Sequence, residues 1–158
     1  MRHADVAPDV DALSREVIGA AIEVHTQLGP GLLERMYEEA LAYELAAIGL
    51  SCESQVQIRV PYKSVMLSAQ RLDLIVENTL IVEVKAVSRT TEIDAAQVLS
   101  YLSYLRCTGK PLGLLLNFHV MQLRDGIRRV VNSKHPALRP SHSPRPSRST
   151  QSSYGERL

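Results

Sequence analysis

The stretch that decides the fold is RLDLIVENTLIVEVK, residues 71–85. It contains two short runs rich in Leu, Ile and Val, which predict β-strands over 71–76 and 80–85. The polar segment 77–79 between them predicts a tight turn. The two strands therefore form an antiparallel hairpin, and the rest of the fold is built around it.

Charged side chains fall on one face of this hairpin, because successive side chains of a strand point to opposite faces. Arg71 and Asp73 share a face of the first strand, and Glu83 and Lys85 share a face of the second. A three-residue turn places Asp73 opposite Glu83, and Arg71 opposite Lys85. The apolar residues of the other face are Leu72, Leu74, Val76, Leu80, Val82 and Val84.

Two opposed carboxylates repel each other, so their pairing predicts a cation between Asp73 and Glu83. Carboxylate oxygens with no Cys or His nearby favour Mg²⁺ or Mn²⁺ over Zn²⁺. Lys85 adds a positive charge beside them. The alternative is a surface salt-bridge ladder, in which Lys85 neutralises the two carboxylates without a metal.

Outside the hairpin, apolar periodicity predicts an α/β fold with a mixed sheet flanked by helices, in the order ααβββαββ. Thr91 and Asp94 predict the N-terminal cap of the third helix. That helix is a crossover before another strand, which indicates a mixed sheet. The expected elements are helices over 13–28 and 32–48, strands over 56–60, 71–76 and 80–85, a helix over 91–106, and strands over 112–118 and 126–131.

Both later helices carry polar groups on or beside their buried faces. Glu34 falls within the apolar stripe of the helix over 32–48, so its carboxylate is expected to face inward, although a glutamate near a helix N-terminus is also favoured by the helix dipole. Gln97 and Tyr101 lie four residues apart on the following helix and are expected to line the same site. Taken alone, Tyr37 and Tyr101 are better explained as core or rim aromatics than as catalytic groups.

The segment GLLERMY, residues 31–37, has the pattern GxxExxY, and Asp73 followed by Glu83-Val84-Lys85 has the pattern D-x9-E-x-K. Together these motifs resemble the GxxExxY proteins of the PD-(D/E)xK nuclease-like superfamily. The resemblance covers about residues 13–132 and implies a restriction-endonuclease-like core.

The resemblance also implies roles for individual residues. Asp73 and Glu83 would bind Mg²⁺, for which Mn²⁺ can substitute, and Glu34 would complete the metal shell. Lys85 would orient the attacking water or stabilise charge on the phosphate. The catalytic residues implied in this way are Glu34, Asp73, Glu83, Lys85, Gln97 and Tyr101.

Composition indicates a soluble globular domain. The chain has 158 residues, of which 45% are hydrophobic and 22% are charged, close to the average globular mixture. No apolar run approaches the roughly 18 residues that span a membrane, and the opening residues are acidic where a signal peptide is basic and then apolar. We therefore expect a cytoplasmic protein with no membrane contact, in which Cys52 and Cys107 are reduced thiols.

Charge is unevenly distributed along the chain. The net charge of +1 divides into −3 for residues 1–133 and +4 for the remainder, so nucleic-acid binding is expected from a local site rather than from bulk charge. We expect a flexible N-terminus over 1–10, the folded domain over 11–132 and a disordered Pro/Ser/Arg-rich tail over 133–158. The basic residues expected to contact phosphates are Arg71, Arg89, Arg106 and Lys110.

These observations predict a Mg²⁺-dependent nuclease, a hydrolase that cleaves phosphodiester bonds of nucleic acid, with DNA as the favoured substrate. The alternative is a catalytically inactive nuclease-fold module that binds nucleic acid or a protein partner. A homodimer also stays open, because two sites can reach both strands of a duplex.

Overall fold

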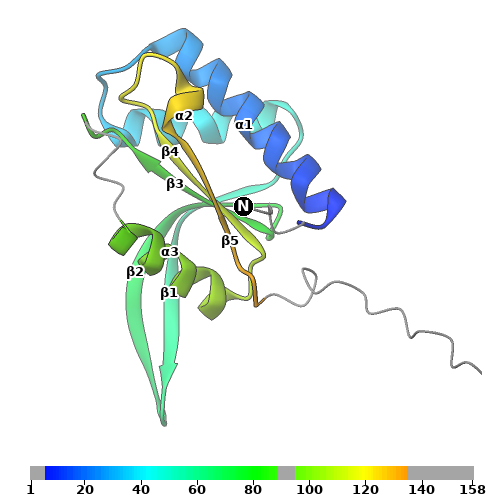
Figure 1. The fold of residues 1–158 in the computed structure, drawn as a ribbon, viewed down its shortest axis with the longest axis vertical. Helices are drawn as coiled ribbons and strands as arrows, with labels where there is room; N and C mark the ends of the chain where they lie inside the picture. Colours follow the sequence, from blue (N-terminus) through cyan, green and yellow to red (C-terminus); the bar gives the residue numbers. More distant parts are fainter. Residues whose placement is uncertain (1–5, 89–94, 135–158) are drawn as a thin grey trace, which may run out of the picture.

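The computed structural model describes residues 6–88 and 95–134, with the order of elements expected from the sequence (Figure 1). A short 3-10 turn, η2, precedes the last strand. The elements are α1 (Pro8–Leu28), α2 (Glu34–Ala47), β1 (Cys52–Tyr62), β2 (Val65–Val76), β3 (Leu80–Lys85), α3 (Ala95–Thr108), β4 (Leu112–Asn117), η2 (Leu123–Gly126) and β5 (Ile127–Val131).

The strands form one mixed sheet in the order β1-β2-β3-β4-β5. Strands β3 and β4 are parallel and the other neighbours are antiparallel. The parallel pair follows from the crossover through α3, which brings the chain back to the end of the sheet at which β3 began. The predicted α/β class with a mixed sheet is confirmed.

Helices cover both faces of the sheet, so the domain has three layers. Helices α1 and α2 pack on one face and α3 on the other (Figure 1). The core under α1 and α2 takes its strand residues from Leu74, Val76, Leu80, Val82, Val84, Leu112, Leu114 and Leu116. The core under α3 contains Ile58, Leu72, Ile75, Ile81, Tyr101, Leu105, Leu115 and Val130.

The connection between α1 and α2 is held by Tyr37. Its ring is fully buried and stacks on Phe118, with ring centroids 4.5 Å apart. Its hydroxyl donates to the carbonyl of Gly29 at 2.5 Å and accepts from the N–H of Leu32 at 3.1 Å. The tyrosine of the GxxExxY pattern is thus a core aromatic that fixes the loop and the start of α2.

Strand β2 departs from regular alternation at Asp73. Leu74 lies in the core under α1 and α2, but Leu72 packs under α3, so the expectation that they share a face is wrong. Gln55 of β1 lies between two residues that pair with Leu74 and Leu72, and it has a φ of 54°, which regular strands do not adopt. The backbone of the β1–β2 hairpin therefore rotates at Asp73, so that Leu72 and Leu74 face opposite sides of the sheet.

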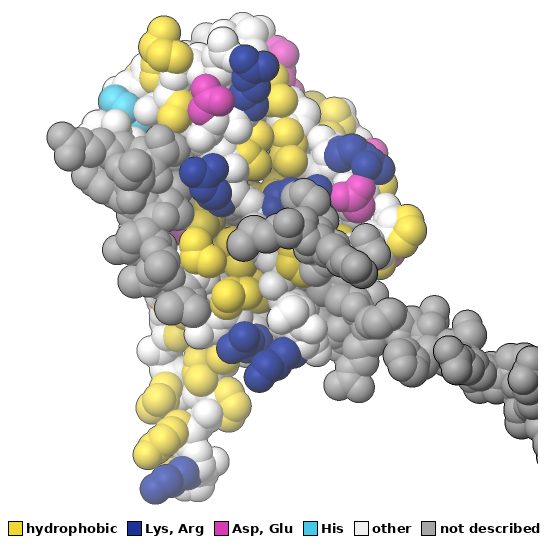
Figure 2. Space-filling view, in the orientation of Figure 1, with side chains coloured by type: hydrophobic (Ala, Val, Ile, Leu, Met, Phe, Trp, Pro, Cys, Tyr) yellow, Lys and Arg dark blue, Asp and Glu magenta, His cyan; other side chains and the backbone are white. Residues whose placement is uncertain are grey.

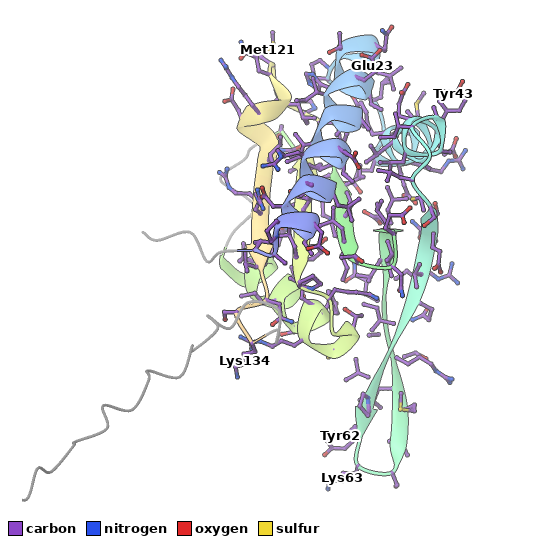
Figure 3. All side chains as sticks on the ribbon, turned by 90° about the vertical axis from the view of Figure 1, so that its right-hand side faces the viewer. Glu23, Tyr43, Tyr62, Lys63, Met121 and Lys134 are labelled. Atoms are coloured by element: carbon purple, nitrogen blue, oxygen red, sulfur yellow. The ribbon has the colours of Figure 1, made fainter. Side chains whose placement is uncertain are left out.

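The hairpin of β1 and β2 extends well beyond the rest of the sheet (Figures 1 and 3). Both strands are longer than expected, with 11 and 12 residues against six in β3 and six in β4. The outer part was missed because it is mostly exposed and therefore shows no hydrophobic period. We call the projecting segment 59–68 the arm.

The structure also bears on the expected ends of the domain. Helix α1 begins at Pro8, inside the segment 1–10 that was expected to be flexible, and Val10 is buried. Three of the expected features lie outside the described residues: residues 1–5, the cap formed by Thr91 and Asp94, and most of the tail over 133–158. In the part of the chain that is described, no helix is long and apolar enough to cross a membrane.

Gly113 of β4 allows α3 to approach the sheet. A Cβ atom at this position would lie 2.2 Å from Cε1 of Tyr101, so we expect Gly113→Ala to lower the free energy of unfolding by about 1–3 kcal/mol, measured by urea denaturation. Gly19→Ala is the matched control, because its Cβ meets nothing within 4 Å in α1; it should be neutral or stabilising by up to about 1 kcal/mol. Equal stability of the two variants would contradict this packing.

Candidate active site

The site lies where β2 and β3 part. Their pairing runs from Val76–Leu80 to Leu74–Val82 and stops there. Beyond it, a carboxylate oxygen of Asp73 accepts the N–H of Val84 at 2.8 Å, and Glu83 Oε1 accepts the N–H of Asp73 at 3.4 Å. The predicted register is confirmed as far as Leu74–Val82. Beyond that pair, the two carboxylates replace the backbone partners that a continued ladder would supply.

The expected pairing of Arg71 with Lys85 is wrong. Arg71 pairs with Gln57 of β1, and Lys85 pairs with Asn117 of β4. The strands have separated at this level because Asp73 occupies the gap with its side chain. Only the two carboxylates and the lysine therefore converge.

Glu83 is the most perturbed carboxyl group of the site. Only 7% of its surface is exposed. Burial and, next, the negative charge of Asp73 raise the pKa of Glu83 to about 7, although the nearby ammonium of Lys85 opposes the shift. Its charge is thus incompletely compensated by the protein.

Lys85 lies 3.5 Å from Glu83, measured between Nζ and Oε2, and its side chain is 25% exposed. This is the single contact of the expected salt-bridge ladder that forms, since Asp73 makes no ion pair with it within the described residues. The carbonyl of Lys85 accepts the N–H of Phe118 at 2.8 Å. The lysine is therefore held on a fixed backbone with its side chain partly exposed.

Asn117 supports this backbone, and sequence analysis did not identify it. It is fully buried at the end of β4. Its side chain accepts from the N–H of Val87 at 3.2 Å and donates to the carbonyl of Val87 at 3.0 Å. A polar residue at the end of an otherwise apolar strand was the available signal, and its role is to position the chain that follows Lys85.

Glu34 reaches the same end of β3 from the N-terminus of α2. One of its carboxylate oxygens accepts the N–H of Ala86 at 3.2 Å. Glu34, Glu38 and Asp73 line an open cleft of about 900 Å³ between α2 and the sheet. Partial burial raises the pKa of Glu38, and the charge of Asp73 adds to this effect. The cleft is thus an acidic surface beside the site.

A second, smaller cavity of about 160 Å³ lies under α3. Its lining includes Glu83 and Lys85 together with Gln97 and Tyr101, as expected from the spacing of the last two residues. Only 3% of the surface of Tyr101 is exposed, and its hydroxyl donates to the carbonyl of Leu114 at 3.2 Å. Its burial raises its pKa, so Tyr101 acts as a packing residue that holds α3 on the sheet.

The basic residues expected at the site are dispersed. Lys110 donates to the carbonyl and side chain of Asn78 in the β2–β3 turn, at the opposite end of β3 from Lys85. Arg106 lies in the last turn of α3, and Arg89 falls outside the described residues. Arg71 alone is placed near the site, two residues before Asp73 on β2.

The donor set fits a hard divalent cation. Asp73 and Glu83 offer carboxylate oxygens, and their mutual repulsion is the penalty that such an ion relieves. No group of three Asp, Glu, His or Cys residues in the described ranges 6–88 and 95–134 is close enough to hold a metal by itself. The remaining positions on an ion would therefore be filled by water or substrate, as is usual for Mg²⁺.

Residues 11–130 match the family model of the PD-(D/E)XK nuclease superfamily. The chain belongs to this superfamily. Its mixed sheet with helices on both faces is consistent with the restriction-endonuclease-like fold. No curated protein and no solved structure matches the chain.

Membership in the PD-(D/E)XK superfamily indicates nuclease activity and nucleic acid as a partner. Nucleases of this superfamily generally use divalent metal ions, which agrees with the chemistry of the Asp73–Glu83 pair. Asp73, Glu83 and Lys85, the residues of the D-x9-E-x-K pattern, lie together at the end of β3.

The raised pKa of Glu83 predicts a pH-dependent stability. Between about pH 4.5 and 7 the folded state retains a proton that the unfolded state has lost, so the free energy of unfolding falls as the pH rises. Glu83→Gln removes this penalty. In chelator, we expect the variant to gain about 2–3 kcal/mol relative to wild type between pH 4.5 and pH 8, measured by urea denaturation.

Glu39→Gln is the control for this comparison, because Glu39 is exposed and pairs with Arg35 on the surface of α2. It should follow wild type across the same pH range. A stability difference between Glu83→Gln and wild type that does not change with pH would contradict the proposed electrostatic cost.

Proposed function

We propose that this protein is a Mg²⁺-dependent nuclease that hydrolyses phosphodiester bonds, with DNA as its favoured substrate, and that it belongs to the GxxExxY group of the superfamily. The observation that carries the proposal is the pairing of partly buried Asp73 with buried Glu83, beside the partly exposed side chain of Lys85. A cytoplasmic location stays a prediction of the sequence.

Asp73 and Glu83 would hold the metal ion, and Glu34 would complete its shell through water. The bound ion would polarise the scissile phosphate and lower the pKa of a water molecule. Mn²⁺ would substitute for Mg²⁺, because both accept carboxylate and water oxygens.

The protein's own groups supply orientation and charge. Lys85 lines the cavity under α3, where its ammonium would stabilise the negative charge that develops on the phosphoryl oxygens. Gln97 lines the same cavity and is exposed, so it would contact the substrate or the attacking water. Tyr101 would contribute by positioning α3, and with it Gln97.

The test is cleavage of labelled DNA and RNA, single-stranded and duplex, in Mg²⁺ or Mn²⁺ and in chelator. Lys85→Ala should retain metal binding but cut at least about 100-fold more slowly, as expected on loss of an electrostatic stabiliser. Asp73→Asn should lose both metal binding and cleavage. The asparagine keeps an oxygen that accepts the N–H of Val84, so the variant should fold.

Lys110→Ala is the matched control, because it removes a lysine at the opposite end of β3 and should leave cleavage unchanged. Cleavage that persists in Asp73→Asn or in chelator would overturn the proposed site. A wild-type protein that neither binds metal nor cleaves would instead favour the inactive binding module.

A further inference from the structure

The candidate active site does not explain why the arm, residues 59–68, projects from the domain. The arm is a two-stranded ribbon that leaves the body of the domain, with Tyr62 and Lys63 at its tip (Figure 3). About half of the surface of each large apolar residue of the tip is exposed: Tyr62 55%, Val65 53%, Met66 53% and Leu67 48%. Such an exposed apolar group on a projecting ribbon marks an interaction surface.

The charge of the arm and its base is entirely positive. Residues 54–72 contain Arg59, Lys63 and Arg71, all exposed, and no Asp or Glu. The rest of residues 1–133 carries ten basic and sixteen acidic side chains. Figure 2 shows the hydrophobic side chains of the arm ending in a basic one at the tip. The arm is therefore a cationic extension of an acidic body.

Tyr62 and Lys63 combine the two chemistries at one point. The ammonium of Lys63 lies 5.5 Å from the centroid of the Tyr62 ring. An exposed aromatic ring beside a cation suits a ligand that offers flat apolar faces and negative charge together, as the bases and phosphates of nucleic acid do. A symmetric contact between the arms of two copies would instead bring the same cations together, which opposes it.

The arm is continuous with the candidate site. Strand β2 runs from the tip directly to Asp73, and Gln70 lines the cavity that contains Glu83 and Lys85. The eight steps along β2 from Val65 to Asp73 span about 26 Å at roughly 3.3 Å each. This corresponds to about eight nucleotides at 3.4 Å per step. A nucleic-acid strand held at the site would therefore reach the tip of the arm.

We propose that the arm binds the nucleic acid that flanks the cleaved bond. Arg59 and Lys63 contact phosphates, and Tyr62 and Met66 contact bases at the tip, about eight nucleotides from the reacting phosphate. This inference rests on the proposed nuclease function for its ligand. Its contacts are made by residues outside the metal site, so they are measurable without hydrolysis.

The experiment measures the Kd of the full chain for a labelled 30-base-pair DNA duplex and a 30-nucleotide single strand, by fluorescence anisotropy in chelator at several salt concentrations. The double variant Arg59→Ala/Lys63→Ala should raise Kd at least tenfold and reduce the slope of log Kd against log salt by about two, as expected for two lost phosphate contacts. Tyr62→Ser/Met66→Ser should raise Kd about five- to tenfold with an unchanged slope.

Matched controls come from the opposite end of the molecule. Tyr43→Ser/Met121→Ser removes two side chains that are 73% and 86% exposed and lie far from the arm (Figure 3). Arg124→Ala removes an exposed arginine of η2. Both controls should bind within twofold of wild type.

Two results would overturn the inference. One is wild-type affinity in both arm variants. The other is conversion of a wild-type dimer into a monomer by the arm variants, seen by light scattering, with Kd unchanged, which would make the arm a contact between copies. The two proposals can fail separately. A protein that cleaves nucleic acid but loses no affinity on arm substitution would support the proposed function and overturn this inference. A protein that binds through the arm but does not cleave would support this inference and overturn the proposed function.

Discussion

The end of the β2–β3 ladder is the constraint on which the site depends. Backbone pairing stops at Leu74–Val82, and the carboxylates of Asp73 and Glu83 take the N–H groups beyond it. Each carboxylate is fixed by the strand that carries the other, which brings two negative charges together in a mostly buried place. The raised pKa of Glu83 reflects the electrostatic cost of that arrangement. A divalent cation is the simplest compensation for this cost.

Strand β3 can carry these charges because its neighbours hold it on every side. It lies in the middle of the sheet, with apolar residues facing the helices on both faces. At its end, Phe118 binds the carbonyl of Lys85 and Asn117 binds the segment that follows. The lysine therefore projects from a rigid backbone, as a group that must meet a phosphate requires.

The GxxExxY segment connects the helical layer to the same strand end. Tyr37 closes the loop before α2 through two hydrogen bonds and a stacked ring, and this fixes the first turn of the helix. Glu34, in that turn, then reaches the N–H of Ala86. The two conspicuous residues of the motif thus have different roles: the tyrosine places the helix, and the glutamate faces the site.

The sequence by itself determined the order of elements, the hairpin register and the meeting of Asp73 with Glu83, because these depend on local periodicity and on the length of one turn. Only the tertiary structure decided the rest. The rotation of β2 at Asp73, which puts Leu72 under α3, follows from the backbone of Gln55 on a neighbouring strand. The position of Lys110 at the far end of β3, the support from Asn117 and the projection of the arm likewise depend on contacts between distant segments. The local sequence pattern does not reveal such contacts, because neither an exposed ribbon such as the arm nor a buried polar residue such as Asn117 produces a hydrophobic period.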